Sequence, residues 1–196
     1  MPVSTTPRRA PDTAARILDV AERLAQVRGY NGFSYADVAA ELRITRASLH
    51  YHFAGKSELG AALVSRYTAR FAQSLAEIDA RGLDAPGMLA AFVTIYAEVL
   101  SGGRVCLCGI LAAEYETLPA PLRAAVTRFF DDTGTWLARV LERGRAEGAL
   151  TFSGDPADAA DAILGGLEGA MLLARTRADL ARFGAAAHAL LRCVGA

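Results

Sequence analysis

The chain has 196 residues, 53% of them hydrophobic, and its 21 basic residues equal its 21 acidic residues, so the formal net charge is +0. This balance excludes a protein that is basic over its whole surface, and the excess of Ala and Leu over β-branched runs favours helices over strands. Three cysteines do not indicate a disulfide framework, and the sequence contains neither an apolar leader nor about 18 consecutive uncharged apolar residues. We therefore expect an all-α, cytoplasmic protein with no membrane partner.

The first 60 residues have the pattern of a tail followed by a small helical domain. Residues 1–11 contain three prolines and the pair Arg8-Arg9, which predicts a mobile arm that is either solvated or laid along a nucleic acid. Three helices follow, and they are expected from residue 12 or 13 to about Arg28, from Tyr35 to about Leu42, and from Arg46 to about Phe53. Gly29 ends the first helix, while Ser34 and Thr45 are placed to cap the other two.

The second and third helices of this set have the pattern of a helix-turn-helix. Val38 and Leu49 point to an apolar inner face, whereas no acidic residue occurs between Leu42 and Ser57. The outer positions carry cations, hydroxyls and imidazoles, namely Thr45, Arg46, Ser48, His50, Tyr51, His52 and Lys56. Such groups donate to phosphates or reach base edges, so this surface is a candidate DNA-binding site.

Lys56 is the only lysine in the chain and stands where the next helix should begin. An ammonium and free backbone N–H groups at a helix N-terminus can together hold one phosphate, which is the interpretation we favour over a solvated turn. The helix that starts at Lys56 or Ser57 is expected to reach about Arg81, with an apolar stripe at steps of three and four.

The composition changes over residues 81–87, and five further helical patterns follow this boundary. They run from Met88 to Leu100, from about Leu107 to Glu116, from about Ala120 to Glu147, from Pro156 to about Arg175, and from Asp179 to about Cys193. Gly165, Gly166 and Gly169 lie inside the fourth of these segments, and each costs a helix roughly 1 kcal/mol relative to Ala. Close approach of another helix would explain them.

The second half of the chain carries a set of aromatic and apolar residues that ordinary core packing would also explain. As a set they favour a pocket for an apolar or aromatic ligand. The candidate lining is Met88, Phe92, Tyr96, Cys106, Leu111, Tyr115, Phe129, Trp136 and Leu137. Glu114 and Glu116 either anchor a cationic ligand there or face solvent.

Cys106-Leu107-Cys108 is too weak a pattern to indicate a metal site, and we expect no metal. Two interpretations stay open for the pair. Both cysteines are small buried hydrophobic residues, or they are redox- or electrophile-sensing thiols whose pKa is lowered by nearby Arg104.

Sequence motifs of enzymes are absent. The chain contains no GxSxG, HExxH, phosphate-binding loop or strand-associated GxGxxG, so we expect no catalytic residue and no cofactor. A helical adaptor that does not bind DNA remains the remote alternative to a DNA-binding protein.

The run from Ile17 to Leu63 resembles the TetR (TetR/AcrR) family of bacterial transcriptional regulators. The resemblance is carried by Gly29-Tyr30, by Val38-Ala39 and above all by LHYHFAGKSEL at residues 49–59. It is strong over about residues 12–65 and covers only the architecture beyond. The sequence departs from the family pattern at His50, where Tyr is common, at Arg43, which replaces a turn glycine and implies a positive φ, and at Ala54, where Pro is frequent.

The resemblance implies a mobile arm at 1–11, a three-helix helix-turn-helix DNA-binding domain at 12–57, a connecting helix at 58–82, and a ligand-binding and dimerisation domain at 83–196. It implies a homodimer, usually a repressor, that binds a near-palindromic double-stranded DNA operator and is released by a small-molecule effector. It adds Ser34, Tyr35 and Ala47 to the DNA-contacting residues. Its dimer interface would lie on the last two helices, at Ile163, Gly166, Leu167, Ala170, Leu173, Ala187, Leu190 and Leu191.

Overall fold

A computed structural model describes residues 13–196, and within this range the chain forms nine α-helices, one 3-10 turn and no strand. The N-terminal elements are α1 (Thr13–Arg28), α2 (Tyr35–Leu42), α3 (Arg46–His52) and α4 (Lys56–Ala80). The remainder are α5 (Ala85–Ser101), α6 (Leu107–Ala113), η1 (Tyr115–Thr117), α7 (Ala120–Ala146), α8 (Pro156–Arg175) and α9 (Leu180–Arg192). The expected all-α fold is confirmed, while the arm at 1–11 lies outside the described residues.

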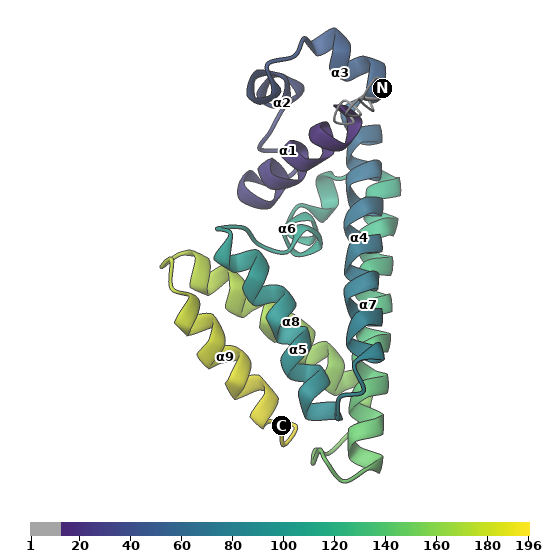
Figure 1. Cartoon of the computed structure of the whole chain (residues 1–196), viewed down its shortest axis with the longest axis vertical. Helices are drawn as coiled ribbons and strands as arrows, with labels where there is room; N and C mark the ends of the chain where they lie inside the picture. The colour runs from purple at the N-terminus through teal and green to yellow at the C-terminus, as the bar shows by residue number, and fades with distance from the viewer. Residues whose placement is uncertain (1–12) are drawn as a thin grey trace, which may run out of the picture.

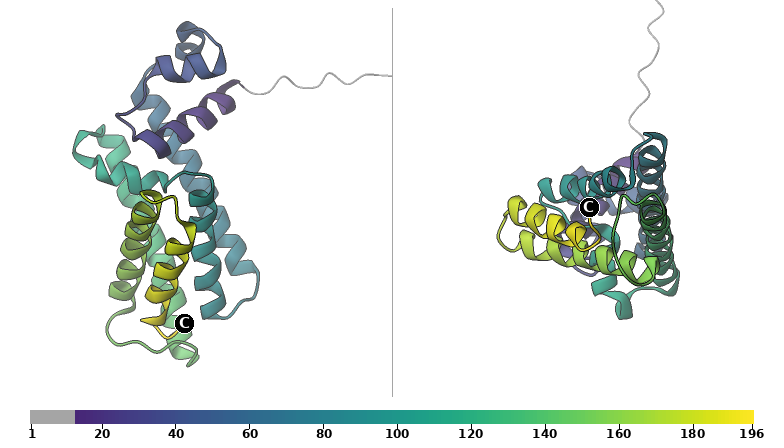
Figure 2. Two further views of the ribbon diagram at one scale, coloured as in Figure 1. Left: turned by 90° about the vertical axis from the view of Figure 1, so that its left-hand side faces the viewer. Right: turned by 90° about the horizontal axis from the view of Figure 1, so that it is seen from below.

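Two long helices, α4 and α7, run side by side along the molecule (Figure 1). The small helices α1 to α3 gather at one end, α5 and α8 pack beside the long pair, and α9 packs on α5 and α8. The helix α6 lies between α1 and this second group, in contact with both α1 and α7. Figure 2 shows α8 and α9 next to each other on one face of the molecule.

Several helix boundaries are set by capping residues that can be identified in the sequence. Ser34 and Asp37 form a capping box at the start of α2, and Thr45 accepts a hydrogen bond from the Ser48 N–H at the start of α3. Hydrogen bonds from Ser34 lower the pKa of Asp37. At α5 the cap is Asp84, so this helix begins at Ala85, three residues before the predicted start.

The predicted helix at 107–116 is two elements rather than one. The helix α6 ends at Ala113, and η1 follows after Glu114. The Glu114 N–H then bonds the Leu111 carbonyl with three-residue spacing, which tightens the chain at this point.

The hydrophobic core is continuous between the two halves of the chain. Ile17 of α1, Leu49 of α3 and Leu63 of α4 are at most 1% exposed. Glu22 of α1 is also buried, and it pairs with Arg66 at 3.1 Å and with Arg70 at 2.5 Å, both on α4. These ion pairs fix α1 against the connecting helix.

Arg43 ends α2 in the left-handed conformation, with φ 54° and ψ 43°. The positive φ expected from the sequence is therefore present. An L-residue with a side chain pays roughly 1–2 kcal/mol for this conformation, whereas glycine adopts it freely at an entropic cost of roughly 0.5–1 kcal/mol.

We predict that Arg43→Gly raises the free energy of unfolding by about 0.5–1 kcal/mol, because the steric penalty exceeds the added chain entropy. Urea unfolding followed by circular dichroism measures the change. The matched control is Arg81→Gly, since Arg81 ends α4 with a φ of −77°. A control that gained as much stability as Arg43→Gly would contradict the steric explanation.

Candidate functional site

The helix α3 lies at one end of the molecule (Figure 1), and polar residues are exposed on its outer side. Leu49 and the following Phe53 are buried beneath it. On the outer side Arg46 and Ala47 are exposed, and Tyr51 is 87% exposed. This geometry leaves the first turn and the far side of α3 free to enter a groove.

His50 and His52 occupy different positions on this helix. The His50 ring lies 4.9 Å from the Tyr35 ring, and its Nδ1 is 3.1 Å from the Ala54 carbonyl oxygen. His52 is half-buried and meets the Tyr51 ring edge-on at 5.3 Å. His50 stays exposed despite its contacts, so a phosphate can still reach its outer edge.

The hydroxyls of Tyr35 and Ser34 are both engaged in hydrogen bonds within the protein. The Tyr35 hydroxyl donates to the Phe53 carbonyl at 3.0 Å, and burial, together with Glu58 and Tyr30, raises the pKa of Tyr35 to about 12. Ser34 donates to and accepts from Asp37 within the capping box. Both residues therefore position the helices, and neither has a hydroxyl free for DNA in this conformation.

Lys56 differs from the sequence-based expectation. Its ammonium lies 4.7 Å from the centre of the Tyr30 ring and 4.6 Å from that of Phe33, and it donates to the Phe33 carbonyl. Burial lowers the pKa of Lys56, against the opposing effect of Glu114. The side chain thus joins the start of α4 to the α1–α2 turn, and the backbone N–H groups at this helix end are suited to a phosphate.

A polar joint connects the α1–α2 turn to the second half of the chain. The Glu114 carboxylate accepts from the Tyr30 N–H at 2.6 Å and from the Asn31 N–H at 3.3 Å. At the end of α1, Arg104 donates to the Gln26 side chain at 3.3 Å, and Arg175 of α8 donates to the Val27 carbonyl. Glu114 is therefore an interdomain acceptor and not an anchor inside an effector pocket.

The residues predicted to line an effector pocket do come together, except one. Phe92, Tyr96, Phe129 and Trp136 belong to one set of ring contacts that also includes Phe71. Met88, Cys106, Leu111 and Leu137 are likewise buried, at no more than 2% exposure. Tyr115 instead lies at the surface, with its hydroxyl 3.1 Å from the Thr127 hydroxyl. The structure fills this region with side chains.

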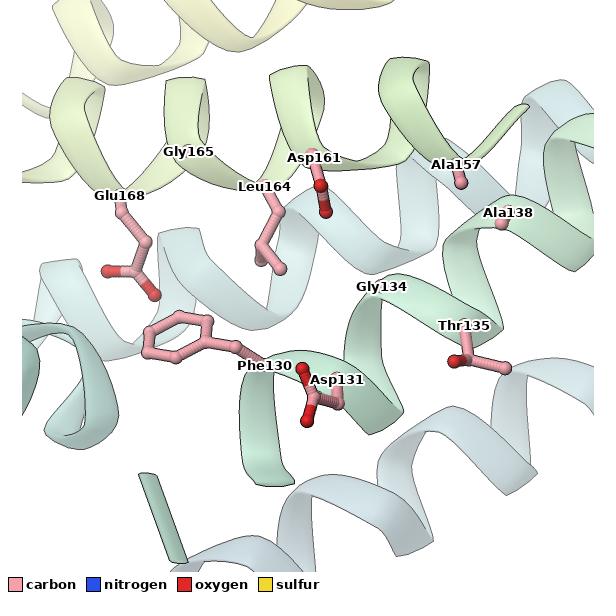
Figure 3. A pocket seen from close by; sticks show the side chains of 10 residues that line it. All are labelled: Phe130, Asp131, Gly134, Thr135, Ala138, Ala157, Asp161, Leu164, Gly165 and Glu168. Carbon is pink, nitrogen blue, oxygen red and sulfur yellow. The ribbon is translucent and has the colours of Figure 1, made fainter. Parts of the chain in front are cut away.

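A cavity of about 540 Å³ lies beside that aromatic cluster, between α7 and α8 (Figure 3). It is lined by Phe130, Asp131, Gly134, Thr135, Ala138, Ala157, Asp161, Leu164, Gly165 and Glu168. None of these was in the predicted pocket. Glu168 had one available sequence signal, because it is a lone acid in the otherwise apolar stretch from residue 162 to 174.

The two cysteines of the CxC pair are both buried. Cys106 accepts from the Tyr67 hydroxyl at 3.4 Å, and its own N–H lies 3.0 Å from the Met171 sulfur. Burial raises the pKa of the Cys106 thiol and that of the Cys108 thiol, with Glu168 adding to both shifts. The lowered pKa that a thiol sensor would draw from Arg104 is therefore absent.

The outer face of α8 and α9 is a shallow apolar groove. It is lined by Gly166, Gly169, Ala170, Leu173, Ala186, Ala189, Leu190 and Cys193. Leu173 is 69% exposed, whereas a Cβ on Gly166 would lie 2.6 Å from Leu190, so this glycine permits close α8–α9 packing. No such contact exists at Gly165 or Gly169.

Five residues predicted for the dimer interface are at most 8% exposed, namely Ile163, Leu167, Ala170, Ala187 and Leu191. Ala170 still borders the groove, whereas the other four do not line it and pack in the core of the subunit. The apolar pattern of α8 extends around most of the helix, so it could not separate the inner from the outer face. Gly166, Ala170, Leu173 and Leu190 remain on the groove.

Among residues 13–196, none of the helices combines the length and the hydropathy that a membrane span needs. The same residues contain no group of three or more His, Cys, Asp or Glu side chains able to hold a metal ion.

Both halves of the chain match models of known protein families. The model for bacterial regulatory proteins of the tetR family matches residues 17–63, and that for the tetracyclin repressor-like C-terminal domain matches residues 82–190. The transcriptional repressor NemR of Escherichia coli K12 is 27% identical over 168 residues, covering 84% of each chain. The regulator AcuR of Cereibacter sphaeroides is 29% identical over 177 residues, covering 86% of this chain and 80% of that protein.

Among solved structures, a TetR-family regulator from Agrobacterium tumefaciens is 35% identical and superposes with a TM-score of 0.89. The match covers 93% of this chain and 97% of that one. The similarity therefore includes the second domain as well as the helix-turn-helix.

We predict that Lys56→Met lowers the free energy of unfolding by about 1–2 kcal/mol, because it keeps the alkyl stem but removes the cation–π contacts and the hydrogen bond to Phe33. Urea unfolding measures the loss. Arg46→Met, on the exposed face of α3, is the control and should stay within about 0.5 kcal/mol. Equal effects of the two substitutions would show that the Lys56 ammonium is not part of the folded core.

Proposed function

The chain belongs to the TetR family of bacterial regulatory proteins, and from this premise we propose that it is a ligand-responsive transcriptional repressor. In this proposal it binds a near-palindromic operator as a homodimer in the cytoplasm, and a small effector releases it. The observation that carries the proposal is the acid-free outer face of α3, supported from below by Leu49 and Phe53.

We assign the DNA contacts to three kinds of group. Arg46 and Ser48 on the first turn of α3 reach base edges, with Ala47 beside them and Thr45 holding the start of the helix. His50, Tyr51 and His52 approach phosphates, and so do the backbone N–H groups at the start of α4. Ser34, Tyr35 and the Lys56 ammonium act by positioning these groups.

We propose that the groove on α8 and α9 is the dimer interface. Two features support this assignment. Leu173 is exposed on the groove, and the small residues around it allow a second subunit to approach closely. A two-fold dimer presents its two α3 helices to successive major grooves, whose half-site centres lie about 34–36 Å apart.

The polar joint around Glu114 supports coupling between effector and operator. An effector releases DNA only if it binds better to a conformation in which the α3 helices no longer match two grooves. Since Glu114 and Arg175 both hold the end of α1, a displacement of α6 or α8 would move the DNA-binding domain.

The two alternative functions have less support. A thiol sensor needs a reactive thiolate, and the buried Cys106 and Cys108 lack one in this conformation. A helical adaptor would not require an acid-free α3 face.

We propose the domain limits 12–57, 58–82 and 83–196. The hydrophobic core is continuous across these limits in the described residues.

The operator test starts from duplexes selected from a random library by the full-length protein. We predict that binding weakens steeply with rising salt, because several phosphates are contacted. Arg46→Ala should cost about 1–3 kcal/mol on the selected site and relax base preference at one position per half-site. Fluorescence anisotropy measures both effects.

The control for this experiment is Arg128→Ala, an exposed arginine on α7. It should leave operator affinity unchanged. Failure to select any sequence, or equal losses from the two substitutions, would count against the assigned DNA-binding surface.

We predict that Leu173→Glu converts the dimer to a monomer and weakens operator binding, because it puts a charge into an apolar interface. Analytical ultracentrifugation at micromolar concentration measures the mass. Leu180→Glu is the matched control, since Leu180 is also an exposed leucine but lies off the groove. A dimer that survives Leu173→Glu would exclude this interface.

A further inference from the structure

The cavity between α7 and α8 is lined by acidic side chains, although the helical domain around it is mostly apolar. Its lining includes the three carboxylates of Asp131, Asp161 and Glu168 and no basic side chain. The remaining lining is apolar or small, with Phe130 contributing an aromatic ring and Thr135 a hydroxyl. At about 540 Å³ the space is within the range that small-molecule ligands occupy.

The three carboxylates differ in environment. Asp131 and Asp161 are exposed and lie at the rim. The Glu168 side chain is half-buried as a whole, and its carboxylate points from α8 into the cavity near Phe130 (Figure 3). Its Oε1 is shielded from solvent; the Tyr96 hydroxyl and the Cys106 thiol lie close enough to lower the pKa of the carboxyl, but neither reaches Oε1 with good hydrogen-bond geometry. A shielded carboxylate oxygen with poorly placed donors carries a free-energy penalty that a suitable ligand can reduce.

The space around Glu168 is maintained by the opposite helix. A Cβ on Gly109 of α6 would lie only 2.1 Å from Glu168 Oε2, so a residue with a side chain there would displace the carboxylate. Glycine at this position therefore keeps Glu168 directed between α6, α7 and α8. This arrangement is typical of a binding site in which the carboxylate is held in place, and not of a carboxylate exposed to solvent.

We propose that this cavity binds a small organic cation with an apolar or aromatic body, and that Glu168 is its buried counter-ion. Asp131 and Asp161 attract the cation at the rim, and Phe130 packs against it through its ring face. Leu164 supplies apolar contact for the body of the ligand. A polyanion is excluded by the same three carboxylates.

The ionisation of Glu168 follows from its neighbours. Burial raises the pKa of Glu168 to about 7, while Cys106 and Tyr96 oppose the rise. The other titratable groups that face it are Tyr67 of α4, Cys108 of α6, Asp131 of α7 and Asp161 of its own helix. Since none of these groups carries a positive charge, the cation itself supplies the charge that favours the ionised form of Glu168.

The effector role of this ligand rests on the proposed function, whereas the binding site does not. A cation that draws Glu168 toward α7 changes the contact with Gly109 on α6. Because Glu114 follows α6 directly and holds the α1–α2 turn, the signal would reach the DNA-binding domain through one short helix.

The test is calorimetric titration of the full-length protein at pH 8 with phenyltrimethylammonium and with its neutral isostere, tert-butylbenzene. The probe has no N–H donor, so the charge alone distinguishes it from the isostere, and we expect the cation to bind at least about tenfold more tightly. Glu168→Gln should abolish this preference and leave the affinity for tert-butylbenzene unchanged. Between pH 8 and pH 6 the wild-type affinity for the cation should fall about tenfold, because protonation removes the counter-ion, while Glu168→Gln should show no such fall.

Asp158→Asn is the matched control, since Asp158 is an exposed acid on α8 that does not line the cavity. If Glu168→Gln fails to fold, Gly109→Ala serves instead, because it displaces the carboxylate without removing the charge. No binding of the cation at millimolar concentration, equal binding of the isostere, or an unchanged preference in the variant that folds would overturn the site.

Operator binding in the presence of phenyltrimethylammonium separates the two levels of the proposal. Release of the operator by wild type but not by Glu168→Gln supports the effector role. If the cation binds and the operator stays bound, the effector role is wrong although the site stands. If the protein binds no operator at all, the proposed function fails independently of the calorimetry.

Discussion

Among the contacts that join the two halves of this protein, the central one is made by the Glu114 carboxylate, which lies against the turn after α1. It accepts backbone N–H groups of Tyr30 and Asn31, and it can approach so closely only because Gly29 has no Cβ. A Cβ there would lie 2.6 Å from Glu114 Oε1, and the φ of +84° also requires glycine. Hydrogen bonds to a charged group contribute roughly 1.5–3 kcal/mol, which is comparable to the coupling free energies of allosteric proteins.

The turn held by Glu114 also holds the DNA-binding domain together. The Tyr30 hydroxyl donates to the Lys56 carbonyl at 3.0 Å, and the Tyr30 ring lies against the Lys56 ammonium. The start of α4 is therefore fixed to the same turn from the other side. Because α3 is linked to α4 through only Phe53, Ala54 and Gly55, the position of α3 is tied closely to the start of α4 and hence to this turn.

Most of the fold could be predicted from the sequence because its signals are local. Ser34, Thr45 and Gly29 fix helix ends within their own turns, and the all-α fold follows from composition and periodicity. The partners of Lys56 and Glu114 could not be predicted, since they are 23 and 84 residues away in sequence. The cavity could not be predicted either. Ala, Gly and Leu occupy most positions around α8, so the sequence does not indicate which face of the helix is buried or where Glu168 points.

The buried polar groups of the second domain explain where ligand specificity can originate. Tyr96 Oη and Glu168 Oε1 are both shielded, and Tyr96 lowers the pKa of Glu168 without reaching it in good hydrogen-bond geometry, so the two groups satisfy each other only in part. The aromatic cluster beside them is fully packed and offers a ligand little new energy. A ligand that brings positive charge, and especially N–H donors, recovers the penalty at Glu168, whereas a purely apolar ligand does not. In the proposed cation site, electrostatics rather than aromatic packing therefore sets the ligand preference.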